Sequence, residues 1–353
     1  MPRQKDAGDS TQCNWIRDWK PNGGAEFLSD DHDAIRIAAK CDFEQLHLVD
    51  PLDDADSENQ QPADDLESTQ FAQLIAAAIE RLNEPEPWGV LWLHSNVLRT
   101  RWDAPRWLAD GEQIDRTESP EPLSEAEQLE MELEPGNPYG EDELPLIFEQ
   151  INVPNLQLEA DAHPDLIAMW MATYACQIRL IDDLLGVLFN AANAAVEDET
   201  QPLFLVTGTS GMSLGQNEWI GHSAGPMRSC QIQVPMVLSQ IGPLRVPSLC
   251  SADSLPKLIG RLASKRLSVD VEDWCQSDSE FSPCLVSCGE DGSQSITSAK
   301  WFFVSEAMDV ESASLRPSRL FLKPDDVDDV NDVSRLRTDV IDQFEEIASS
   351  QQE

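Results

Sequence analysis

Two short apolar runs with a long helical segment between them constrain the fold more than any other feature of this chain. Trp88–His94 (WGVLWLH) and Pro202–Gly208 (PLFLVTG) are almost continuously apolar, as strands covered on both faces of a sheet are. We predict both as buried strands and Trp88–His94 as a central one. A helix is predicted from Pro164 to about Ala195, because proline suits a first helical turn. This order predicts an α/β fold with a mostly parallel sheet between helices.

The remaining apolar patterns complete this prediction. A helix over 71–82 follows from Phe71, Leu74, Ile75, Ala78 and Leu82, which share one helical face. Asp64 and Glu67 would form a capping box at its start. The other predicted elements are strands at Glu44–Asp50 and Gln231–Ser239, a late antiparallel strand pair at 299–304 and 319–323, and a closing helix at Leu336–Ile347.

These elements suggest one main domain with a small appendage. We expect an α/β core over 1–288 and a small antiparallel C-terminal subdomain over 289–353. Residues 111–160 are acidic and rich in proline, which is typical of a surface insertion within the core.

The charge of the chain excludes some classes of partner. It carries 65 acidic and 24 basic residues, a formal net charge of −41, so nucleic acid and anionic membranes are repelled. No signal peptide is visible at the N-terminus and no run of about 18 apolar residues occurs, which predicts a cytoplasmic protein. The eight cysteines include no CxxC pair, so we expect reduced thiols and no zinc site at Cys275, Cys284 and Cys288.

Two glycine-containing strings invite a catalytic interpretation. Gly221–Gly225 (GHSAG) has the form of a serine-hydrolase nucleophile elbow around Ser223. An elbow needs a buried strand before it and a helix after it, and its histidine follows the serine. GQNEWI precedes this string, and no histidine lies beyond Ser223. The second string, VTGTSGMSLGQ over 206–216, lacks the lysine of a phosphate-binding P-loop and the glycine spacing of a dinucleotide loop.

Five segments, in order over roughly residues 25–350, share a pattern with one known family. They are LWLHSNVLRTRWDAP, similar to L-H-x-x-D-P-H-x-P-Y-x-x-P; YACQIRLIDDLLGVL, with Tyr174, Asp182 and Gly186 at family positions; LVTGTSGMSLGQ, similar to V-T-S-D-H-G-x-S-L-G-E; SADSLPKLIGRL; and RLFLKPDDVDDVNDV. Together they resemble the sulfatases of the alkaline-phosphatase superfamily. The overall pattern looks most like the divergent sulfatase-like proteins of planctomycete-type bacteria.

The resemblance implies a sulfatase fold whose chemistry has been lost. The family's formylglycine precursor, C/S-x-P-S/A-R, does not occur, and GGAEFLSDD resembles a family segment that follows it. We therefore expect the family's nucleophile strand to be missing. The family's D-H metal pair aligns with Thr209 and Ser210, and the histidine of its D-P-H motif aligns with Arg99. Calcium, the cofactor expected of the family, would lack its carboxylate ligands. We predict no metal and no cofactor.

The groups left for an anion are His94, Arg99, Arg101 and His222, together with the loop amides of Gly208, Thr209 and Ser210. Three of these candidates have a simpler explanation. His94 could be a hydrogen-bonded structural histidine. Arg99 and Arg101 could form local salt bridges in their acidic surroundings, with Asp103 as a turn or capping residue.

Two hypotheses remain open. In the first, the protein has lost sulfatase activity and keeps the scaffold to bind a sulfated or phosphorylated small ligand or a partner. In the second, it is a residual ester hydrolase completed by a partner subunit or by an N-terminal extension. A strand missing from a sheet leaves an edge to be covered, which predicts either a homodimer or an N-terminal segment that covers the edge.

Overall fold

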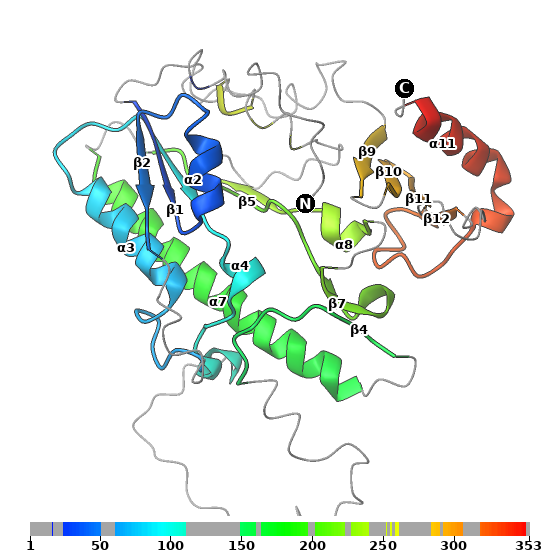
Figure 1. Ribbon diagram of the computed structural model, residues 1–353, viewed down its shortest axis with the longest axis horizontal. Helices are drawn as coiled ribbons and strands as arrows, with labels where there is room; N and C mark the ends of the chain where they lie inside the picture. The colour runs from blue at the N-terminus through cyan, green and yellow to red at the C-terminus, as the bar shows by residue number, and fades with distance from the viewer. Residues whose placement is uncertain are drawn as a thin grey trace, which may run out of the picture.

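The computed structural model describes residues 16, 24–50, 61–110, 149–159, 164–196, 202–222, 227–239, 252, 255, 258–260, 284–289, 292–305 and 318–350. Figure 1 shows a parallel sheet with helices near the N-terminus and an antiparallel sheet with one helix at the C-terminal end. The main helices are α2 His32–Ala38, α3 Gln70–Leu82, α4 Val97–Thr100, α7 Pro164–Ala194, α8 Ser229–Ile232 and α11 Thr338–Ser350. Short 3₁₀ turns lie at Arg106–Asp110, Gln216–Glu218 and Ser334–Leu336.

The described strands form four sheets. The strands are β1 Ala25–Ser29, β2 Gln45–Leu48, β3 Val90–His94, β4 Leu156–Gln157, β5 Leu205–Thr207, β6 Ser213–Leu214, β7 Trp219–Gly221, β8 Met236–Leu238, β9 Cys284–Cys288, β10 Gln294–Ser298, β11 Trp301–Ser305 and β12 Arg319–Leu322. Their orders are β2-β1-β3, β4-β7-β6, β5-β8 and β12-β11-β10-β9.

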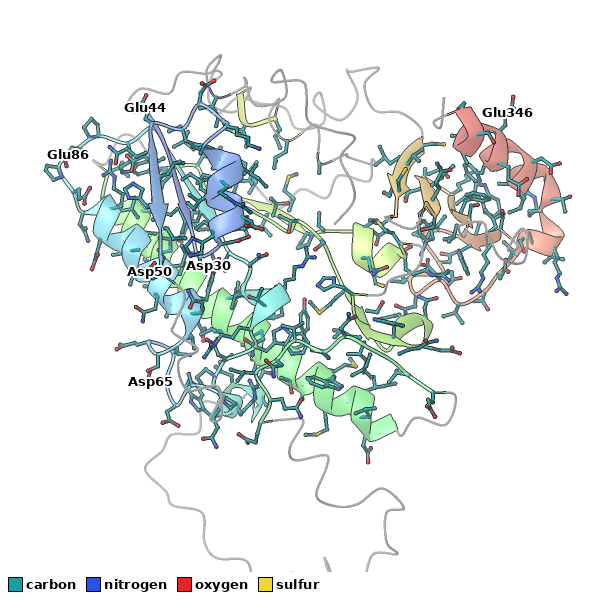
Figure 2. The ribbon with its side chains drawn as sticks, in the orientation of Figure 1. Asp30, Glu44, Asp50, Asp65, Glu86 and Glu346 are labelled. Carbon is teal, nitrogen blue, oxygen red and sulfur yellow. The ribbon has the colours of Figure 1, made fainter. Side chains whose placement is uncertain are left out.

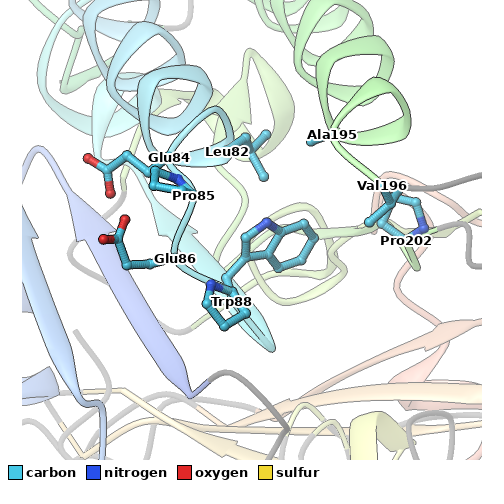
Figure 3. A pocket seen from close by; sticks show the side chains of 9 residues that line it. Leu82, Glu84, Pro85, Glu86, Trp88, Ala195, Val196 and Pro202 are labelled. Carbon is cyan, nitrogen blue, oxygen red and sulfur yellow. The ribbon is translucent and has the colours of Figure 1, made fainter.

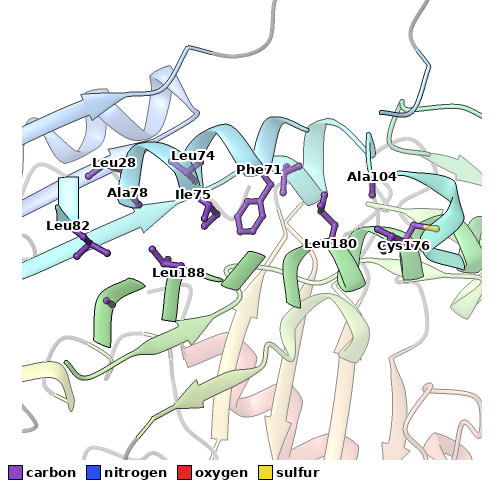
Figure 4. Close-up of a cluster of buried hydrophobic side chains, with 13 residues drawn as sticks. Leu28, Phe71, Leu74, Ile75, Ala78, Leu82, Ala104, Cys176, Leu180 and Leu188 are labelled. Atoms are coloured by element: carbon purple, nitrogen blue, oxygen red, sulfur yellow. The ribbon is translucent and has the colours of Figure 1, made fainter. Parts of the chain in front are cut away.

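The parallel sheet β2-β1-β3 is covered by helices on both faces. Successive side chains of a strand point to opposite faces. Phe27 accordingly packs with Ala34 and Ala38 of α2, while Leu28 joins the core beneath α3. Figure 4 shows this core lying between α3 and α7. These layers confirm the predicted α/β architecture.

The helix pattern is confirmed, but its predicted cap is wrong. Phe71, Leu74, Ile75, Ala78 and Leu82 are all buried along α3. The helix begins at Gln70, and Asp64 and Glu67 do not cap it. The Thr69 side chain accepts the Ala72 N–H at 3.3 Å. Asp103, which is distant in sequence, accepts the Gln70 N–H at 2.9 Å. The capping role predicted for Asp103 is thereby confirmed.

Two strand predictions need correction. β3 lies at an edge of the described parallel sheet, and the central strand is β1, buried at all five residues. The predicted strand Gln231–Ser239 is the short helix α8 followed by β8, and β8 pairs antiparallel with β5. Apolar content alone suggested the wrong central strand, because β1 contains the polar Glu26 and Ser29.

The C-terminal elements agree with the sequence. β11 and β12 pair antiparallel, within a sheet that also contains β10 and β9. The closing helix α11 packs Val340 and Phe344 against Ile296, Phe303 and Leu320 of this sheet. β9, which lies before the predicted subdomain boundary at 288, pairs with β10 after it.

A buried ion pair joins the central strand to α3. Arg81 Nε and Nη2 donate to the two carboxylate oxygens of Glu26 at 2.7 and 2.5 Å. The Glu26 side chain is 3% exposed and that of Arg81 5%. A two-pronged pair of this kind fixes geometry as well as charge. His47 of β2 approaches the same carboxylate at 3.3 Å.

Arg81→Met should therefore destabilise the protein by about 3 kcal/mol, because it leaves the Glu26 carboxylate buried without its main partner. The double variant Glu26→Leu/Arg81→Met should regain most of this loss. Chemical denaturation monitored by circular dichroism measures both. Arg36→Met is the control, since its ion pair with Asp33 is exposed and should matter by less than about 1 kcal/mol. Equal losses for Arg81→Met and Arg36→Met would contradict the prediction.

Candidate functional site at the carboxyl edge of the sheet

The carboxyl ends of β1 and β3 bring polar groups to one edge of the parallel sheet. Ligands of α/β proteins bind at this edge. Asp30 and Asp31 follow β1, and Ser95 and Asn96 follow β3, whose last residue is His94. Figure 2 shows Asp30 and Asp50 at this edge and Glu44 and Glu86 toward the opposite one.

His94 is held in one orientation by the central strand. Its Nδ1 lies 2.9 Å from Ser29 Oγ, and its ring stacks on Phe27 with centroids 6.1 Å apart. Ser29 Oγ also accepts the Asp31 N–H at 3.0 Å. The hydroxyl lies closer to His94 than to the Asp31 carbonyl, at 3.4 Å, which favours its hydrogen on the Nδ1 bond. With Nδ1 engaged by Ser29, Nε2 is the ring nitrogen left for a ligand.

The two aspartates after β1 fasten this edge together. Asp30 accepts the Ser95 hydroxyl at 2.6 Å and the Asn96 N–H at 3.0 Å. Asp31 caps α2 by accepting the Asp33 N–H at 2.8 Å, and its other oxygen accepts Asn96 Nδ2 at 2.8 Å. All four carboxylate oxygens therefore accept hydrogen bonds from the protein itself.

His222 and Arg99 lie far apart in the sequence but interact electrostatically. His222 follows β7, and burial lowers its pKa, with a further lowering from the positive charge of Arg99. Within the described residues, the buried His222 Nε2 has no hydrogen-bond partner. Arg99 lies on α4, which begins three residues after His94. A cationic guanidinium and an imidazole nitrogen without a partner are each suited to contact an anionic group.

Arg101 is engaged in a local ion pair. Its Nε donates to Asp103 Oδ2 at 3.2 Å, as the salt-bridge alternative predicted. Asp103 is 2% exposed, and burial raises its pKa, against the lowering by the Gln70 N–H and Arg101. Arg101 therefore stabilises a buried helix cap.

The loop after β5 offers less to an anion than its glycines suggest. The Gly208 N–H donates to the Pro235 carbonyl at 3.1 Å, so this amide is already used. Thr209 and Ser210 are exposed. A Cβ at Gly211 would come within 2.0 Å of the Cys230 carbonyl oxygen, so this glycine allows the loop to pack against α8. The anion-contact role of Gly208, Thr209 and Ser210 stays a prediction.

The GHSAG string begins with a glycine that the backbone requires. Gly221 has φ +99°, and a Cβ there would lie 1.9 Å from the Pro154 carbonyl oxygen. It ends β7, which pairs antiparallel with β4 and β6 in a small sheet. A nucleophile elbow requires a strand of the main sheet, and β7 is not one. Ser223 itself lies outside the described residues.

Sequence reasoning did not identify Ser29, Asp30 and Asn96 as parts of this edge. Their contacts span 65 or 66 positions in the chain, and no local pattern marks them. The available signal was the polar string SDDHD directly after an extended apolar segment.

The described part of the chain holds no group of three His, Cys, Asp or Glu side chains placed to share a metal ion. None of its helices is long and apolar enough to cross a membrane. The described cysteines, at positions 41, 176, 230, 284 and 288, form no disulfide with one another, and Cys275 lies outside the described residues.

Solved structures share this fold. A 2-O GAG sulfatase aligns with a TM-score of 0.58 at 10% identity, over 99% of this chain and 75% of the sulfatase. A phosphonate monoester hydrolase from Silicibacter pomeroyi aligns with a TM-score of 0.53 at 14% identity, over 97% of this chain and 80% of the hydrolase. No family model and no curated protein sequence matches the chain. The chain has the fold of the sulfatases and related alkaline-phosphatase superfamily members, as its sequence resemblance predicted.

Gly221→Ala should lower the free energy of unfolding by about 2 kcal/mol or more, because alanine is strained at this positive φ and its Cβ meets backbone. Gly186→Ala is the matched control. Gly186 lies on α7, where an added Cβ would have no atom within 4 Å, so alanine should stabilise the helix by up to about 1 kcal/mol. Thermal melting of both variants tests the pair, and a Gly221→Ala variant as stable as the wild type would refute it.

His222 should titrate below the ordinary histidine pKa of about 6.5. Because the folded state resists its protonation, His222 should make the protein less stable as the pH falls through 6.5 toward the folded pKa. Arg99→Gln should raise the His222 pKa only in part, since burial is the larger cause. Histidine ring resonances followed by NMR against pH measure both effects. A midpoint at or above 6.5 in the wild type would show the prediction wrong.

Proposed function

We propose that this protein is a sulfatase-like scaffold that binds a sulfated or phosphorylated small ligand and does not hydrolyse it. The observation that carries the proposal is the buried His222 Nε2, which has no hydrogen-bond partner among the described residues and lies within the electrostatic influence of Arg99. Arg99 and the two imidazoles could offer hydrogens to the oxygens of one sulfate or phosphate group.

Charge makes this cluster selective. The chain carries a net charge of −41, so most of its surface repels anions. An anion would be held only where fixed hydrogen-bond donors attract it more strongly than the acidic surface repels it. His94 is already oriented by Ser29, so little conformational entropy is lost when its Nε2 meets a ligand.

The same edge supports a binding role over a hydrolytic one. Ser29 Oγ lies beside His94, but Ser29 is fully buried and is unsuited to attack an ester. The family's calcium finds too few ligands in the described part of the chain, because no third His, Cys, Asp or Glu is placed to share a metal ion with Asp30 and Asp31. Thr209 and Ser210, which align with the family's D-H pair, have no carboxylate to add.

A second candidate is a residual sulfuric- or phosphoric-ester hydrolase completed by a partner subunit or an N-terminal extension. It is favoured by the coverage of the two solved enzymes. This chain aligns with 75% of the sulfatase and 80% of the hydrolase, so 25% and 20% of their lengths are not aligned with it. Those regions could supply chemical groups that this chain lacks.

The two candidates give opposite results with 4-nitrophenyl sulfate and 4-nitrophenyl phosphate. If the proposal holds, either ester binds in a calorimetric titration and no 4-nitrophenolate is released. Arg99→Gln should weaken binding about fivefold or more, equivalent to a loss of about 1 kcal/mol or more for a charge-assisted contact. Arg335→Gln, which removes an exposed arginine in the C-terminal part, should leave binding unchanged.

Release of 4-nitrophenolate by the pure chain, abolished by a chelator, would overturn the binding-only proposal in favour of the hydrolase. Equal weakening by Arg99→Gln and Arg335→Gln would instead remove the assigned site, since it would indicate attraction by overall charge alone.

A further inference from the structure

A cavity at the opposite, amino edge of the sheet is unrelated to the anion cluster. It has a volume of about 380 Å³ and is open to solvent, within the size range of small-molecule sites. Its walls come from the end of α3 with the segment leading into β3, and from the end of α7 with Pro202 ahead of β5. Figure 3 shows Glu84 and Glu86 on one side, Val196 and Pro202 on the other, and the Trp88 indole between them.

The electrostatics of this cavity favour a positive charge. Glu84 and Glu86 both line it and are both exposed. Arg81 approaches Glu84 at 3.5 Å, but its charge is already matched by Glu26 in a closer, two-pronged pair. Glu84 and Glu86 therefore give the lining of the cavity a net negative charge.

Two helix ends add to this field. α3 ends at Leu82 and α7 at Ala194, and Leu82, Ala195 and Val196 all line the cavity. A helix C-terminus carries about half a negative charge, although at the end of α3 the amides of Asn83 and Glu84 donate to carbonyls of the last turn. Both C-termini thus favour a cation in the same space as the two glutamates.

The apolar part of the lining requires more than a bare ion. The indole of Trp88 packs against the core beneath α3, and Leu82, Val196 and Pro202 complete an apolar wall. Pro85 and Pro87 restrict the backbone between α3 and β3, so the lining is largely preformed. An aliphatic chain would cover the indole and this wall while its charged end faces the glutamates.

We propose that this cavity binds a primary alkylammonium ion, with the ammonium group at Glu84 and Glu86 and the alkyl chain against Trp88. Its ligand class, location and residues differ from those of the anion cluster, so the two sites are independent.

The test uses pentylammonium as the probe and 1-pentanol as its uncharged counterpart. The indole N–H resonance of Trp88, assigned by its loss in Trp88→Phe, is followed by NMR in the full chain. Saturable shifts with pentylammonium at concentrations below about 0.1 M, and weaker binding of 1-pentanol, are expected for a weak site of this kind. Glu86→Gln should raise the Kd about three- to fivefold, as for an exposed charge pair.

Glu346→Gln is the matched control. Glu346 is also exposed and lies on α11 at the other side of the molecule (Figure 2), and its replacement removes the same charge, so the Kd should equal that of the wild type. Equal weakening in both variants would overturn the proposal by showing attraction to the overall acidic charge. Binding of 1-pentanol as tight as that of pentylammonium would show an apolar pocket without a preference for a cation. The absence of any saturable Trp88 shift would exclude the site. Circular dichroism of each variant confirms that it is folded.

Discussion

The central strand of this protein contains a carboxylate that can be buried only because an arginine from α3 meets it. Glu26 lies in the middle of a sheet layer, 2% exposed, where an unpaired charge would be strongly unfavourable. Arg81 satisfies both of its oxygens. This contact ties the register of β1 to the position of α3, and α3 in turn packs on α7 through the main core. Loss of either partner alone would therefore leave a buried charge where β1 and α3 meet.

The fold could be predicted where the pattern is local. The periodicity of its own residues predicts the apolar face of α3, and Pro164 predicts the start of α7; the structure confirms both. β1 was not predicted, because its polar residues are buried through partners far along the chain: Arg81 for Glu26 and His94 for Ser29. Helix starts depend on tertiary contacts as well, as the Asp103 cap of α3 shows.

The candidate site, like the fold, could be predicted where the signal is local and not where it depends on contacts between distant residues. The position of His94 at a strand end was visible in the sequence, and the acidic neighbour of Arg101 foretold its ion pair with Asp103. The hydrogen bond that orients His94 and the effect of Arg99 on His222 could not be derived from spacing. The first arises because β1 and β3 pair across 65 positions of the chain, and no local motif encodes that pairing.

The polarity of α/β units explains why the two edges of this sheet favour opposite charges. Strands β1 and β3 point to the carboxyl edge, so helices that connect to them run back toward the amino edge. α3 ends immediately before the segment leading into β3, and α7 ends before β5, which places two negative helix ends beside Trp88. Donors for an anion gather at the other edge, where His94 ends its strand and Arg99 follows on α4. In a chain with a net charge of −41, a cation needs an apolar wall to be held specifically, whereas an anion needs a local excess of positive donors. Trp88 supplies the apolar wall for the cation, and Arg99 supplies positive charge for the anion. Neither site requires the other.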